Sequence, residues 1–149
     1  MPRAILLFNG IYFSFTAVGR AFAWARQNGG TIEAIFLKAK NEDEEGYGFP
    51  SDLDAAENLY TEKDAENADE QIIRNHIHIL EREAVVERIP LKTSLLIDPS
   101  MPELLAKCAQ AEFVFIPRKL EKKDLLCIDI NIGQLGKSIK VPFEIIEEN

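Results

Sequence analysis

The sequence has few cysteines and lacks the short motifs that mark common enzyme classes. Among 149 residues there are two cysteines, Cys108 and Cys127, which is too few for a disulfide scaffold. Neither has a neighbouring histidine or a C-x-x-C spacing, so we interpret both as core thiols in a reducing compartment. No serine lies in a G-x-S-x-G elbow. These absences predict a protein that is not an enzyme.

The sequence also lacks a metal-ligand set. His76 and His78 are two residues apart in the segment Ile-His-Ile-His-Ile. No acid or cysteine cluster joins them, whereas zinc sites need three or four ligands. On a helix the two side chains would point about 200° apart. We therefore expect structural histidines and no bound metal.

Long apolar runs are missing as well. No run approaches the roughly 18 residues that cross a bilayer, so we expect no membrane span. The apolar stretch Ile5–Phe8 is too short for a signal-peptide core and has no small-residue cleavage site behind it. We therefore place the protein in the cytoplasm.

The negative charge is concentrated in one segment. The net charge is −8, and residues 40–90 hold fifteen acids and five bases. An acidic chain repels phosphate backbones, so we expect no nucleic-acid partner. The acidic segment fits either a solvated surface or a surface that binds a protein partner, and both interpretations stay open.

What is present is a regular alternation of strand and helix patterns over one predicted domain, residues 1–149. Apolar runs predict strands at residues 4–8, 31–39, 91–97, 113–116 and 141–146. Helices are predicted between Ser14 and Gly29-Gly30, over 61–88, and from the Ser100–Glu103 capping box. Residues 40–60 are predicted to form a long acidic loop. Such alternation predicts a parallel sheet with helices on both faces, a three-layer α/β/α fold.

Residues 124–140 fit two patterns. Leu126, Ile128, Ile130 and Ile132 alternate as in a strand, whereas Leu125, Ile128, Ile132, Leu135 and Ile139 have helical spacing. We expect a helix over most of this segment.

Three segments together resemble the universal stress protein family. Ile5–Gly30 resembles its first strand, turn, serine-capped helix and glycine stop. Ile97–Ile116, beginning Ile-Asp-Pro-Ser, resembles the end of its third strand, the following helix and its fourth strand, and Val141–Ile146 resembles its proline-bearing last strand. The resemblance implies five parallel strands in the order 3-2-1-4-5, a Rossmann-like fold, a role in the stress response, and a homodimer that often forms through the last strand.

The chain departs from the family where many members bind ATP. Those members use an aspartate after the first strand and a G-x2-G-x9-G-[ST] motif after the fourth. Here the aspartate position falls on Asn9 or Gly10, and the glycine positions fall on or beside Pro117, Leu120 and Ile130. Glycine lets backbone amides approach phosphate, and proline has no amide hydrogen. We therefore expect no ATP site of the family's usual kind, and no cofactor.

The implied strand order places a crevice between the first and fourth strands, where ligands of open α/β sheets bind. We expect Asn9, Gly10, Ala39, Arg118 and Lys119 to line it. Arg118, Lys119, Lys122 and Lys123 suggest an alternative function, an anion or nucleotide site built from side chains. The competing interpretation of these bases is a solvated turn.

The segment after residue 130 contains a partial glycine motif. Gly133-x-x-Gly136-Lys137-Ser138 resembles part of a phosphate loop, but Asn131 stands where its first glycine is required. Three functions therefore remain: a non-catalytic, dimeric stress-protein-like module, the anion or nucleotide site, and a flavin-linked domain. The first is preferred, and the third is the weakest because flavin-binding loops are missing.

Overall fold

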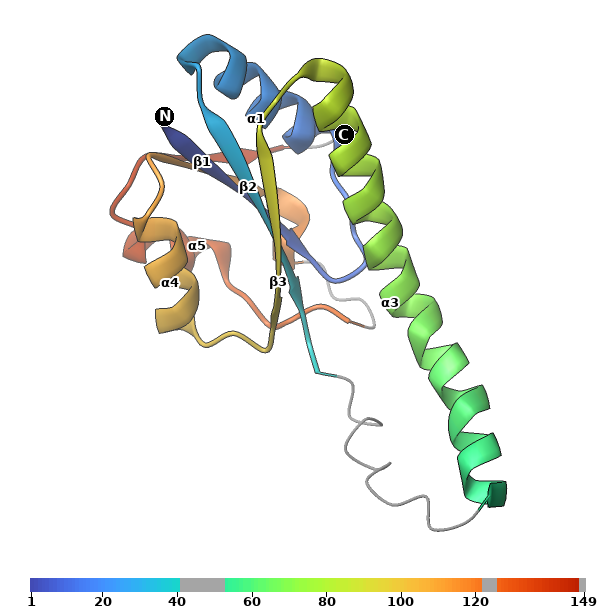
Figure 1. Cartoon of the computed structure of the whole chain (residues 1–149). Helices are drawn as coiled ribbons and strands as arrows, with labels where there is room; N and C mark the ends of the chain where they lie inside the picture. The colour runs from blue at the N-terminus through green and yellow to red at the C-terminus, as the bar shows by residue number, and fades with distance from the viewer. Residues whose placement is uncertain (41–52, 122–125, 148–149) are drawn as a thin grey trace.

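The computed structural model describes the backbone of residues 1–40, 53–121 and 126–147, and the side chains of these residues except 53–69. The strands are β1 (Arg3–Asn9), β2 (Thr31–Lys38), β3 (Leu91–Ile97), β4 (Phe113–Pro117) and β5 (Phe143–Ile146). The helices are α1 (Phe15–Asn28), α3 (Leu53–Glu87), α4 (Met101–Ala109) and α5 (Ile132–Ser138), with a 3-10 turn, η1, at Arg118–Glu121 (Figure 1).

The five strands form one parallel sheet in the order β3-β2-β1-β4-β5. The predicted fold class and strand order are therefore confirmed. The strands are added toward one edge of the sheet from β1 to β3 and toward the other edge from β4 to β5. This order reverses between the parallel neighbours β1 and β4, where Ala4 lies opposite Phe113. The carboxyl ends of these two strands define the place where a ligand of such a sheet would bind.

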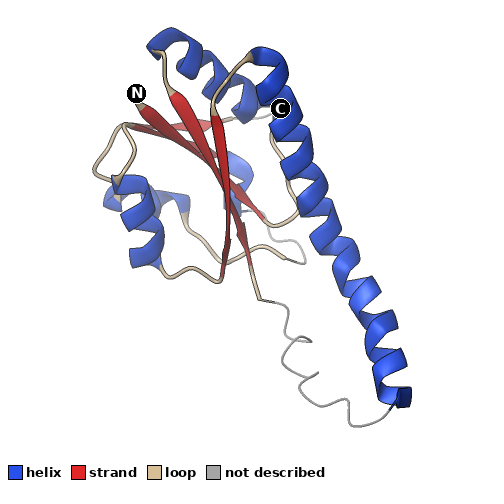
Figure 2. Ribbon diagram, in the orientation of Figure 1, coloured by secondary structure: helices blue, strands red, loops and turns tan. Residues whose placement is uncertain are grey.

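The continuous apolar run of β1 is explained by burial on both faces. Ala4, Leu6 and Phe8 pack on one face with α1 and α3, and Ile5 and Leu7 pack on the other with α4 and α5. Figure 2 shows the helices on both sides of the sheet. Because successive side chains of a strand point to opposite faces, a central strand needs apolar residues throughout.

Local signals set the ends of two helices as predicted. The Ser14 hydroxyl accepts a hydrogen bond from the backbone N–H of Ala17 at 3.0 Å and begins α1. Gly29, at φ 59°, ends it in the left-handed conformation. Ser100 accepts from the N–H of Glu103 and begins α4.

Helix α3 begins at Leu53 and not at Thr61, so the predicted loop at 40–60 was too long at its carboxyl side. The remainder of that loop, residues 41–52, lies outside the described residues. Buried Ile73, Leu80 and Ala84 hold the second half of α3 on the sheet, while the first half extends past it (Figure 1). Within the described part of the chain, no helix is both long and apolar enough to cross a membrane.

The prediction of a helix over most of 124–140 was wrong. Of the described residues 126–140, only Ile132–Ser138 are helical, because the Asn131 side chain accepts from the N–H of Gln134 at 2.9 Å and begins α5 there. Residues 126–131 instead run without regular structure toward α5. The Leu126 oxygen accepts from the N–H of Ala39, just past β2, and the Ile128 backbone bonds to the Asn9 side chain at the end of β1.

Candidate functional site

The candidate site is the carboxyl edge of the sheet at β1, β2 and β4. Asn9 ends β1 and Pro117 ends β4, so both residues lie at this edge. The contacts there decide whether the edge is open to a ligand.

Asn9 is only 2% exposed, and its amide group is fully engaged inside the protein. Its Nδ2 donates to the backbone oxygens of Leu120, at 2.7 Å, and Ile128, at 2.9 Å. Its Oδ1 accepts from the N–H of Ile128 at 2.8 Å. One side chain therefore binds two segments that follow β4, and it does not face a ligand.

The neighbouring backbone groups are engaged in the same way. The N–H of Ala39, just past β2, donates to the oxygen of Leu126 at 2.7 Å. The N–H of Gly10 donates to the oxygen of Leu37 at 2.8 Å, with Gly10 at φ 67°. The segment 126–130 therefore lies across the ends of β1 and β2, where Asn9 and Ala39 were expected to line a crevice.

Apolar side chains lie at two of the positions that correspond to the glycines of the family's ATP-binding motif. Leu120 and Ile130 are both buried, in the core cluster that also holds Leu104 and Leu135. An exposed glycine would let a phosphate approach the backbone here, whereas these side chains fill the space.

A carboxylate of the chain occupies the amino end of α5. Glu121 Oε1 accepts from the N–H of Ile132 at 2.6 Å. Unpaired amides at a helix start attract anions. At this helix, the Asn131 cap and Glu121 already bind two of those amides.

Arg118 and Lys119 contact other partners than Asn9. Arg118 has a side chain that is 54% exposed, and it donates to Glu147 Oε1 from Nε at 2.8 Å and from Nη2 at 2.6 Å. The hydrogen bonds and charge of Glu147 raise the pKa of the Arg118 guanidinium. Lys119 Nζ lies 5.4 Å from the centre of the Tyr12 ring. The predicted joint site of Asn9 and Arg118 is therefore not formed, because one residue is inside the fold and the other is on its surface.

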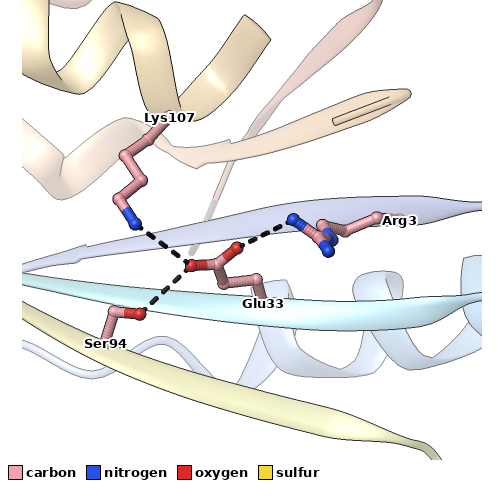
Figure 3. Close-up of polar contacts among 4 residues, drawn as sticks. All are labelled: Arg3, Glu33, Ser94 and Lys107. Carbon is pink, nitrogen blue, oxygen red and sulfur yellow. Dashed lines mark hydrogen bonds and ion pairs between the residues drawn. The ribbon is translucent and has the colours of Figure 1, made fainter. Parts of the chain in front are cut away.

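A second polar cluster, in the interior on the α4 side of the sheet, was missed by the sequence interpretation. Figure 3 shows Glu33 of β2 receiving a hydrogen bond from Ser94 Oγ at 3.1 Å, with Arg3 Nη1 at 3.6 Å and Lys107 Nζ at 4.0 Å. The Glu33 side chain is 3% exposed, whereas Arg3 and Lys107 keep contact with water. Arg3, Glu33 and Lys92 line a hollow of about 220 Å³ there. A lone carboxylate inside an apolar strand was the available signal.

The remaining candidates have structural contacts. His76 stacks on Phe13, with ring centres 4.8 Å apart, and burial lowers the pKa of its imidazole. Cys108 is buried, and burial raises the pKa of its thiol to about 11, while Cys127 is half-buried. Among the residues that the structure describes, no three histidine, cysteine or acidic side chains come together as a metal site.

Comparison with solved structures shows which known fold this is. A universal stress protein family member from Burkholderia pseudomallei is 11% identical, with 97% of this chain and 94% of that chain covered and a TM-score of 0.61. A universal stress protein from Arabidopsis thaliana with AMP bound is 11% identical, with 100% and 93% covered and a TM-score of 0.58. A universal stress protein in complex with cAMP is 11% identical, with 99% and 98% covered and a TM-score of 0.53.

No protein-family model and no curated protein matches the sequence. The structural comparisons confirm the predicted resemblance at the level of the fold. The chain has the fold of the universal stress proteins.

Proposed function

We propose that this chain is a non-catalytic, cytoplasmic module of the universal stress protein kind that does not bind ATP in the usual way. It acts through dimerisation and through contacts with a protein or a small ligand. In place of a nucleotide, its own segment 126–130 lies across the carboxyl ends of β1 and β2.

The observation that carries this proposal is the set of bonds made by Asn9. A ligand at this edge would have to displace Leu120 and Ile128 from a buried amide. A buried polar group left without a partner costs about 1–3 kcal/mol. Displacement would therefore expose several such groups at once, together with buried apolar side chains.

Two of the similar solved structures hold nucleotides, cAMP in one and AMP in the other. For this chain we expect neither to bind at the corresponding edge. Glu121 at the start of α5 adds a negative charge that would repel a phosphate.

The alternative, an anion site built from the basic residues, is less well supported. Glu147 neutralises the Arg118 guanidinium, and the Lys119 ammonium lies against the Tyr12 ring. The other two bases of this alternative, Lys122 and Lys123, lie outside the described residues.

The experiment is a thermal-shift series with ATP and magnesium, AMP, cAMP, FMN and inorganic phosphate. We expect no stabilisation by any of them. The assay is sensitive enough to show binding, because a ligand at 100 times its Kd would stabilise the fold by about 2.7 kcal/mol. Stabilisation of several degrees by ATP with magnesium would overturn the proposal. If phosphate alone stabilised the protein and Arg118→Ala with Lys119→Ala removed the effect, the alternative would replace it.

A further inference from the structure

The hollow of about 220 Å³ beside Glu33 lies at the amino ends of three strands. Arg3 begins β1, Thr31 begins β2, and Lys92 is the second residue of β3. This end of the sheet is opposite the carboxyl edge that holds Asn9. Four of the side chains that line the hollow are polar, those of Arg3, Thr31, Glu33 and Lys92.

The strand register places these four side chains on one face of the sheet. Arg3 pairs with Thr31, and Glu33 pairs with Lys92. Thr31 and Glu33 are two residues apart on β2, so their side chains point to the same face. Ile35, a further two residues along, packs in the core cluster on the α4 side. The four polar side chains therefore meet on the α4 face.

The Glu33 carboxylate has an incomplete set of hydrogen bonds, although its side chain is buried. Its Oε2 accepts from Ser94 Oγ at 3.1 Å. Its Oε1 lies 3.6 Å from Arg3 Nη1, which is an ion pair but too long for a hydrogen bond (Figure 3). Among the residues that the structure describes, none donates a hydrogen bond to Oε1. A buried acceptor of this kind calls for a further partner.

The two cations that line the hollow keep donors for another molecule. The guanidinium of Arg3 has five N–H donors, and within the described chain its side chain makes the ion pair with Glu33 and no hydrogen bond. The Lys92 ammonium is exposed, and it has neither an ion pair nor a hydrogen bond to the described residues. Guanidinium groups bind carboxylates through two parallel N–H···O bonds. Arg3 and Lys92 can therefore bind a carboxylate together.

The hollow thus presents charges of both signs, and this limits what fits it. A simple anion would match Arg3 and Lys92 but would lie close to the Glu33 carboxylate, which repels it. A simple amine would match Glu33 but would lie close to two cations. A molecule that carries a carboxylate and an ammonium on neighbouring atoms matches both parts of the hollow.

We propose that this hollow binds a small free amino acid. The α-carboxylate binds Arg3 and Lys92, and the α-ammonium donates to Glu33 Oε1. Ser94 and Lys107 hold the other oxygen of Glu33 and so position the carboxylate. The size agrees, because pockets for drug-sized ligands measure roughly 300–1,000 Å³, and a hollow of about 220 Å³ suits a smaller molecule.

This inference rests on the small-ligand part of the proposed function and gives that ligand a chemical class and a place. The two can fail separately. Stabilisation by ATP with magnesium would overturn the closed carboxyl edge and leave the hollow unaffected. A failure of amino acids to bind would overturn this inference and leave the bonds of Asn9 unaffected.

Isothermal titration calorimetry at neutral pH tests the ligand class. L-Alanine carries both charges, propionate lacks the ammonium, and ethylamine lacks the carboxylate. We expect L-alanine to bind at least about tenfold more tightly than either fragment, and glycine and L-serine to bind as well. Binding of none of the three amino acids would show that the hollow holds water only and would overturn the inference. Propionate binding as tightly as L-alanine would overturn the contact between the ammonium and Glu33.

Glu33→Gln tests the ammonium contact. We expect it to raise the Kd for L-alanine at least about tenfold and to leave propionate binding equal or tighter, because the repelling carboxylate is gone. A merely structural role of Glu33 would weaken both ligands alike, and that result would contradict the assignment. Circular dichroism checks that the variant folds.

Lys92→Gln keeps the inference testable if Glu33→Gln fails to fold, because Lys92 is exposed. We expect this variant to weaken L-alanine and propionate alike, since both carry the carboxylate. Lys137→Gln is the matched control, because Lys137 is also exposed but belongs to α5 and does not line the hollow. Unchanged L-alanine binding in Lys92→Gln, or an equal loss in Lys137→Gln, would overturn the inference.

Discussion

Two polar clusters lie inside this sheet, and they are built differently. At the carboxyl ends of the strands, the neutral amide of Asn9 is matched to three backbone groups at hydrogen-bond distance. On the α4 side, the Glu33 carboxylate has one hydrogen bond and two cations at 3.6 and 4.0 Å that remain in contact with water. The first arrangement closes a site by filling it, whereas the second buries one charge beside an open hollow.

The difference matters because neutral and charged groups respond differently to loss of a partner. A buried amide that loses its partners leaves unpaired backbone groups in an apolar core. A carboxylate beside solvated cations can lose one partner and still be balanced by the other. The carboxyl edge should therefore tolerate change less well than the Glu33 cluster.

The largest expected effect is at Asn9. Asn9→Asp restores the residue type that the family resemblance implies but removes both amide hydrogens, leaving the oxygens of Leu120 and Ile128 without a donor. We expect the free energy of unfolding to fall by about 2–4 kcal/mol, since each unpaired buried group costs about 1–3 kcal/mol.

Urea unfolding measures this loss, and Asn28→Asp is the matched control, because the Asn28 amide makes one exposed bond to Trp24. That control should lose less than about 1 kcal/mol. If the two variants lost the same stability, the closed carboxyl edge would not be held by Asn9.

The next effect is at Glu33. Glu33→Gln keeps the shape of the side chain but removes the charge that faces Arg3 and Lys107. We expect a loss of about 1–2 kcal/mol in the same urea assay, because a hydrogen bond to a charged group is worth more than one to a neutral group. Arg3→Ala should lower the free energy of unfolding by less, because the Arg3–Glu33 ion pair is longer than the Ser94–Glu33 hydrogen bond and Arg3 is partly exposed. A neutral or stabilising Glu33→Gln would show that the cluster contributes nothing to the fold.

A smaller effect is expected from pH at His76. Burial against Phe13 lowers the pKa of this imidazole, so the unfolded chain binds a proton more readily than the folded one. Stability is therefore complete above the unfolded pKa of about 6.5 and falls as the pH decreases through it. The melting temperature measured from pH 7.5 to 5.5 should decrease, and His76→Phe should reduce the slope. His78→Phe is the control, because His78 is exposed, and an equal change in that variant would contradict the assignment.

The smallest effect is expected at Arg118. Its ion pair with Glu147 joins two exposed side chains, and such pairs contribute little. Arg118→Ala should leave the urea midpoint unchanged within error. A clear loss of stability would show that the carboxyl terminus is held by this pair.

Much of the fold was predictable because its signals are local. The continuous apolar run of β1, the Ser14 and Ser100 caps and the glycine stop at Gly29 each act within a few residues. The segment 126–131 was not, since its alternating apolar residues fit a helix and a strand equally well. Its conformation depends on bonds to Ala39 and Asn9.

The sequence predicted that Asn9 lies at the end of the first strand but not which groups it contacts. Asn9 does lie at the reversal point of the sheet, but its partners are 111 and 119 residues away in the chain. Such pairing carries no short-range signal in a single sequence. We expected Asn9 and Arg118 to share a crevice because both follow neighbouring strand ends. Residues at neighbouring strand ends need not have side chains that meet.

The sequence by itself determined the order of strands and helices, the caps, and the absence of the glycines that bring phosphate to the backbone. These follow from residue type and spacing alone, because periodicity and capping are short-range effects. Only the tertiary structure decided that the segment after β4 folds back over the edge and that Asn9 binds it. Those outcomes depend on which distant backbone groups meet, and folding alone brings them together.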